Sequence, residues 1–149
     1  MADIHIEEFY ADAAKMLVSL YGIFPRPVTL FVEDICGPDE PDEYGVHSHR
    51  HQACFATMLF LANEGFIQFG QTIRSEAVDQ ASLTGKCFSS LMTPLAIELV
   101  SPVDKSLPPS VLTERSTVAF QLTEAIKLNN TERTSTIMLH LICEMTRSR

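Results

Sequence analysis

Apolar residues in this chain recur mostly at three- and four-residue steps, which is the period of an α-helix with one buried face. Two strong stripes of this kind cover residues 3–22 and 48–64, each ending at a glycine that can adopt a left-handed backbone. In the second segment the main stripe consists of Phe55, Met58, Leu59 and Ala62. Because its other faces are also apolar or small, we expect this helix to be largely buried.

Strand-like alternation is clearest directly after Gly65. Residues 66–69 alternate and predict a short strand, and 81–84 predict the return strand of a hairpin whose long polar tip is 70–80. A short helix over 85–92 follows, with Thr84 as its cap. The sequence therefore predicts a mostly helical α+β fold that contains one small hairpin.

Residues 28–36 give two conflicting signals. Their β-branched side chains favour a strand, whereas Pro27 before them and Gly37 after them favour a short helix. We favour the helix.

The C-terminal segment 113–146 contains few helix breakers but carries two apolar stripes that conflict. One stripe is Val118, Leu122, Ala125 and Ile126, and the other is Met138, Leu141, Ile142 and Met145. In one straight helix these stripes would lie on opposite sides. A break at Asn129-Asn130, with Thr131 capping a new helix, resolves the conflict and predicts a helical hairpin.

Two short motifs frame the predicted hairpin, Gly65-Phe66-Ile67 and Leu83-Thr84-Gly85-Lys86. In this order they resemble the end of the DNA-facing helix and the return of the wing in winged-helix domains, and the chain is similar to a group of uncharacterised small bacterial proteins with such a core. The resemblance implies a winged-helix-like core at 5–92 with a two-stranded wing. A Pro-rich connection at 93–112 would then lead to the helical hairpin at 113–146, which packs on the core or on a second subunit.

The same resemblance implies DNA binding, but the residues support it poorly. A base-reading helix needs several outward donors, and the candidate contacts are few: Arg50, His51, Gln52, Arg74 and Lys86, with Arg115 as a more distant addition. At the return of the wing the usual order is Lys-Gly, whereas this chain has Gly85-Lys86. About ten residues separate the candidate second helix from the helix at 48–64, where a helix-turn-helix has a turn of only about 3–4 residues. The net charge is -8, and all of the excess lies in residues 1–64. Such a surface repels a phosphate backbone.

The densest group of potential metal ligands is His47-Ser48-His49-Arg50-His51. Its one i, i+4 pair, His47 with His51, is the candidate for a transition metal, and upstream acids could add oxygen ligands (Asp39, Glu40, Asp42 and Glu43). The alternative is a helix N-terminus rich in polar side chains. The neighbouring Cys54 lies among apolar residues and is expected to be a core thiol.

Together these features predict a small non-enzymatic interaction or regulatory module without a cofactor. The apolar stripe of Met138, Leu141, Ile142 and Met145 is the candidate interface, with a protein partner or with a second copy in a homodimer. A winged-helix transcriptional regulator is the main alternative, and metal or small-ligand binding at 47–54 is the lesser one. The N-terminus lacks a basic region and an apolar signal core, so we expect a cytoplasmic protein.

Overall fold

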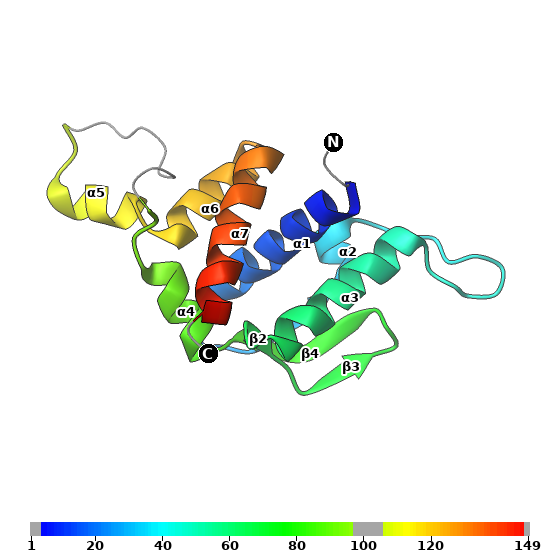
Figure 1. Ribbon diagram of the computed structural model, residues 1–149. Coiled ribbons are helices and arrows are strands. Elements are labelled where there is room, and N and C mark those ends of the chain that lie inside the picture. The colour runs from blue at the N-terminus through cyan, green and yellow to red at the C-terminus, as the bar shows by residue number, and fades with distance from the viewer. Residues whose placement is uncertain (1–3, 97–105, 148–149) are drawn as a thin grey trace.

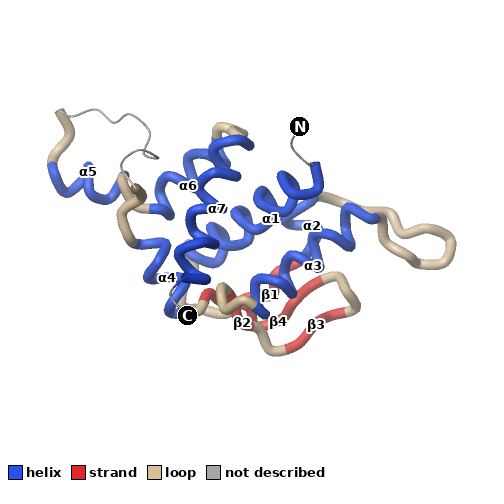
Figure 2. Tube along the Cα trace, viewed as in Figure 1, coloured by secondary structure: helices blue, strands red, loops and turns tan. Residues whose placement is uncertain are grey.

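The computed structural model describes residues 4–96 and 106–147. The protein is a mostly helical α+β structure, as the sequence predicted, with a small antiparallel sheet at one side (Figures 1 and 2). The first helix, α1 (Ile4–Tyr21), has its buried residues in its second half, from Asp12 to Leu20, and ends before Gly22. The first residue of the predicted segment 3–22, Asp3, lies outside the described residues.

Residues 28–36 divide between a strand and a helix, so the expectation of one short helix is wrong for the first half. Strand β1 (Val28–Phe31) pairs with a later strand, and α2 (Val32–Cys36) follows at once. The β-branched start fits a pleated surface, whereas Gly37 ends the helix with φ 94°.

The third helix, α3 (His49–Asn63), begins at the predicted cap. The Ser48 side chain accepts a hydrogen bond from the His51 backbone N–H, and Gly65 follows with φ 84°. Its buried face is rotated around the helix axis from the predicted one by about one residue step, or ~100°. The fully buried members are His51, Cys54, Thr57, Met58 and Leu61, whereas Leu59 and Phe60 are exposed. The helix is therefore half-buried and presents an apolar outer face.

The sheet is larger than the predicted hairpin. It contains β2 (Ile67–Gln68), β3 (Gln71–Ile73) and β4 (Ala77–Leu83), and its order is β1-β4-β2, with β3 also paired to β4. The expected pairing of 66–69 with 81–84 is confirmed by the register Ile67 to Leu83. The expected long tip is wrong, because three residues, Arg74 to Glu76, connect β3 to β4, with φ of 48° at Arg74 and 60° at Ser75.

Helix α4 (Gly85–Met92) matches its predicted bounds, and the Thr84 hydroxyl accepts a hydrogen bond from the Cys87 N–H at 3.1 Å. Within the expected connection 93–112, residues 97–105 lie outside the described part of the chain. The start of this connection is bonded to the chain just after it, since the Leu95 N–H donates to the Ser116 carbonyl at 2.8 Å.

The C-terminal region forms three helices where the sequence predicted two. Helix α5 (Pro109–Arg115) begins inside the expected connection, and α6 (Val118–Lys127) and α7 (Thr131–Arg147) form the predicted hairpin. The break is confirmed at Asn129, which has φ 52°. The cap lies one residue earlier than expected, because the Asn130 Oδ1 accepts from the Arg133 N–H at 3.0 Å.

Helix α1 lies at the centre and contacts α3 and β4 as well as α6 and α7 (Figure 1). One hydrophobic cluster includes residues from both 5–92 and 113–146, so the hairpin packs on the rest of the same chain. This corrects the predicted interface. Met138, Leu141 and Met145 are buried inside the chain, and Ile142 is half-buried against the same core.

Candidate functional site

A polar cluster lies where the loop after α2 meets the start of α3 and the turn between β3 and β4. The carboxylate of Asp39 accepts hydrogen bonds from the Ser48 hydroxyl and from the Ser48 backbone N–H. Its Oδ2 also lies 2.8 Å from Nδ1 of His47. These contacts, with the Ser48 hydroxyl bond first, hold the pKa of Asp39 below its ordinary value. The loop is thereby tied to the helix cap.

The two histidines predicted as a pair, His47 and His51, do come together. Their rings stack with centroids 3.7 Å apart and planes 8° apart. His51 is 1% exposed, and its Nε2 lies 3.0 Å from the Ser75 carbonyl. The Nε2 of His47 lies 3.7 Å from a carboxylate oxygen of Glu76. Of the four upstream acids, it is Asp39 that joins this pair.

The best-placed cation of the DNA-binding alternative, Arg50, is already engaged. Its guanidinium forms a bidentate ion pair with Asp12 of α1, at 2.6 and 2.7 Å. Asp12 is 1% exposed, and this bonding raises the pKa of Arg50 above its ordinary value. Arg50 therefore fastens α3 to α1.

The other predicted DNA contacts do not converge. His51 is buried, and the Gln52 side chain donates to the His47 carbonyl at 2.8 Å. Arg74 and Lys86 are exposed but lie beyond opposite ends of β4, a strand about 20 Å long at ~3.3 Å per residue. Arg115 lies 5.8 Å from the centre of the Phe120 ring.

An apolar groove of about 320 Å³ runs between α1 and α3, on the outer face of α3. Ala53, Ala56 and Phe60 line it from α3, and Ile6 and Phe9 line it from α1. The Phe9 and Phe60 rings meet edge to face at 5.3 Å. Both Ile6, 41% exposed, and Phe60, 38% exposed, remain accessible to a partner.

Two of the cysteines, Cys54 and Cys87, lie in the core and are not activated nucleophiles. Cys54 is fully buried, and burial raises its pKa, as it raises the pKa of Cys87 to about 12. The expectation that Cys54 is a core thiol is confirmed.

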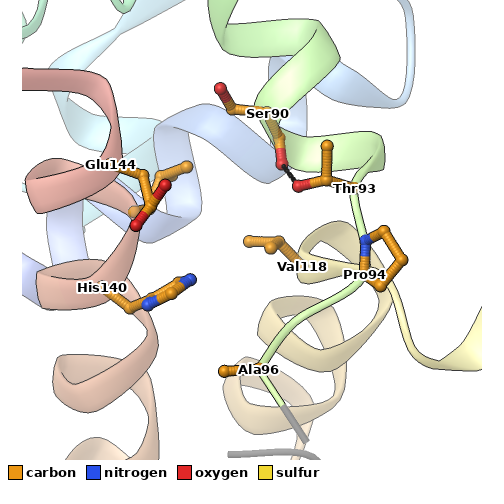
Figure 3. Close-up of a pocket in the computed structure, with 8 residues that line it drawn as sticks. Ser90, Thr93, Pro94, Ala96, Val118, His140 and Glu144 are labelled. Atoms are coloured by element: carbon orange, nitrogen blue, oxygen red, sulfur yellow. Dashed lines mark hydrogen bonds between the residues drawn. The ribbon is translucent and has the colours of Figure 1, made fainter. Parts of the chain in front are cut away.

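A second pocket, of about 450 Å³, lies between α4, α6 and α7 (Figure 3). His140 and Glu144 point into it from α7, one helical turn apart, and Ser90 and Thr93 line the opposite wall. The drawn hydrogen bond joins the Thr93 hydroxyl to the Ser90 carbonyl at 2.6 Å, within the end of α4.

Comparison of the chain with protein families, with curated proteins and with solved structures found no match. In residues 4–96 and 106–147, no helix combines the length and apolarity that crossing a membrane requires.

Sequence reasoning missed Asp12 and the groove. The signal for Asp12 was available, because it precedes the buried Met16 and Leu20 at four-residue steps and so places an acid on the core face of α1. The groove gave no local signal, since it arises where two helices distant in sequence meet.

Proposed function

We propose that this protein is a small, non-enzymatic interaction module whose contact surface is the apolar groove between α1 and α3. The observation that carries the proposal is the composition of the outer face of α3. Ala53, Ala56, Leu59 and Phe60 are exposed there beside three polar residues, His49, Gln52 and Asn63, and no exposed residue of α3 is an acid, a lysine or an arginine, as a solvated helix would present.

The occupant we propose is an amphipathic helix of a partner protein, with basic residues flanking its apolar face. Small side chains at Ala53 and Ala56 allow another backbone to approach closely, and Phe60 and Ile6 offer larger apolar contacts. The acid Glu8 lines the groove, and the entire net charge of the chain falls within residues 1–64. Complementary charge therefore favours a basic partner over a second, equally acidic copy of this chain.

A winged-helix ancestry of the scaffold is part of the proposal. In its support, the elements follow the order α1-β1-α2-α3-β2-β3-β4, and the sheet order is β1-β4-β2, with β3 also paired to β4. On such a scaffold α3 would be the helix presented to DNA. The middle of its outer face carries Ala53, Ala56 and Phe60, and the face holds no lysine or arginine to contact phosphates; of its exposed amides, Gln52 already donates to the His47 carbonyl.

The test uses a fluorescent synthetic peptide with a leucine face flanked by lysines, titrated with the purified protein. Ala56→Arg places a long cation in the groove at an exposed position, and Leu139→Arg on α7 is the matched control at another exposed position. We expect the wild type and the control to bind the peptide, and Ala56→Arg to lose at least tenfold in affinity, about 1.4 kcal/mol.

Two measurements on the same samples can overturn the proposal. A mobility shift with duplex DNA that weakens steeply as salt rises would instead support the transcriptional regulator. A dimer in sedimentation that Ala56→Arg dissociates would place a second copy in the groove. Absence of peptide binding by the wild type would remove the basic helix as occupant.

A further inference from the structure

We propose that Asp39, His47 and His51 form a binding site for a divalent transition metal of the Zn²⁺ type. Each residue offers one ligand atom, and the three atoms lie within 4.8 Å of one another. The site joins the loop after α2 to the start of α3, and it is separate from the groove between α1 and α3.

The strongest observation is the unpartnered nitrogen of His51. Its Nε2 faces the Ser75 carbonyl at 3.0 Å, and a carbonyl oxygen only accepts, so this nitrogen carries the proton. When the ring is neutral, Nδ1 carries the lone pair, and this atom is buried and has no hydrogen-bond partner. This lone pair lies 3.9 Å from Oδ2 of Asp39, which is also an acceptor. Two acceptors that face each other in a buried site call for a cation between them.

The groups behind the ligands match the pattern of metal sites. A metal-bound histidine usually donates its other N–H to a carbonyl or a carboxylate, which orients the ring. His51 has the Ser75 carbonyl in this position, and the Nε2 of His47 lies 3.7 Å from Glu76. Asp39 is in turn held by the Ser48 hydroxyl and N–H. Asp39 and His51 thus each have an outer hydrogen-bond partner, and Glu76 lies near the outer nitrogen of His47.

The distances require only a small rearrangement. Ligand atoms about 2.0–2.1 Å from a tetrahedral Zn²⁺ lie about 3.3 Å apart. Oδ2 of Asp39 lies 2.8 Å from Nδ1 of His47 and 3.9 Å from Nδ1 of His51, so the two values bracket this spacing.

The rings now stack within 8° of parallel, and in-plane lone pairs of parallel rings do not converge. One ring therefore tilts to admit the ion. His47 precedes the helix cap and is 14% exposed, whereas His51 is enclosed, so the tilting ring is that of His47. In neutral His47 the proton moves from Nδ1 to Nε2, where it can bond to Glu76.

Two nitrogens and one carboxylate oxygen suit Zn²⁺ and neighbouring first-row ions better than Ca²⁺ or Mg²⁺, which prefer all-oxygen sites. Three protein ligands leave one position for water or for an outside ligand.

The test is calorimetric titration of chelator-treated, full-length protein with Zn²⁺, together with the visible absorption of Co²⁺ as a probe of nitrogen coordination. His51→Asn and Asp39→Asn remove one ligand each. His49→Ala is the matched control, because His49 is adjacent, exposed and outside the cluster. We expect one equivalent of Zn²⁺ to bind to the wild type and to His49→Ala, with at least a tenfold loss in both ligand variants.

Two further measurements keep the proposal open to refutation if His51→Asn fails to fold. Asp39→Asn changes a loop residue, and circular dichroism checks that it remains folded. Glu76→Gln is expected to weaken Zn²⁺ binding about tenfold through the orientation of His47. At a Zn²⁺ concentration about 100 times the Kd, Tm should rise by about 5–10 °C, and a chelator should reverse the rise. Absence of binding at millimolar Zn²⁺, or equal losses in Asp39→Asn and His49→Ala, would overturn the proposal.

Discussion

Replacing Arg50 with methionine should destabilise the protein far more than the loss of a surface cation usually does. The change leaves the Asp12 carboxylate, 1% exposed, without the two hydrogen bonds that compensate its burial. Breaking a buried pair in this way costs about 3–5 kcal/mol. The Arg50 side chain is 34% exposed, so water can partly replace it, and we expect a loss of about 3 kcal/mol. For a chain of this size that lowers Tm by about 6–12 °C.

The assay is urea unfolding followed by circular dichroism. Arg147→Met is the matched control, because Arg147 pairs with Glu144 at the surface and its loss should cost less than about 0.5 kcal/mol. The double variant Asp12→Leu/Arg50→Met should recover most of the stability, since no charge then remains buried. A loss below about 1 kcal/mol in Arg50→Met would refute the reasoning, as would a double variant no more stable than the single one.

Three other outcomes follow from burial and hydrogen bonding. A thiol reagent should label Cys143 rapidly in the native protein and Cys87 only after unfolding. The reason is that Cys143 is exposed, whereas burial raises the pKa of Cys87 to about 12. Rapid labelling of Cys87 in the native protein would contradict this. Met138→Ala should lower the free energy of unfolding by about 2–5 kcal/mol without changing the sedimentation mass, whereas Leu139→Ser, at a position 51% exposed, should change it by less than about 0.5 kcal/mol. The pKa of Asp39 is lowered, so its contacts with Ser48 should persist at a pH equal to the ordinary aspartate pKa and disappear only as the pH falls further. The measurement is the NMR titration of the Ser48 amide, and a midpoint at or above the ordinary aspartate pKa would contradict the prediction.

The helices whose limits were predicted well are those with local signals at both ends. Ser48 and Thr84 accept hydrogen bonds from N–H groups three residues later, and Gly65 ends α3 with a positive φ. Such interactions form within one turn, so the sequence near the helix end is enough to specify them. The break at Asn129 was found because two apolar stripes could not share one core.

The features that were missed depend on contacts between distant segments. Strand β1 is a strand because β4 pairs with it, and the residues near Val28 contain no signal for that distant partner.

The turn at Arg74 and Ser75 was missed for a local reason, because it lacks the glycine or asparagine that usually marks positive φ.

In the candidate sites too, the features that depend on local spacing were predicted, and those that depend on distant segments were missed. The His47 and His51 pair followed from helical spacing, whereas the contribution of Ser75 and Glu76 required the β3–β4 turn to fold against it. The buried face of α3 was set by the ion pair of Arg50 with Asp12 as well as by apolar content.

The central place of α1 has a consequence for synthesis of the chain. On the ribosome α1 emerges well before α7, which covers part of it and is completed more than a hundred residues later. At the usual speed of translation that interval is on the order of ten seconds. Over that interval the part of α1 that packs against α7 lacks its final cover, so the nascent chain should be a client of chaperones that shield such surfaces until α7 docks.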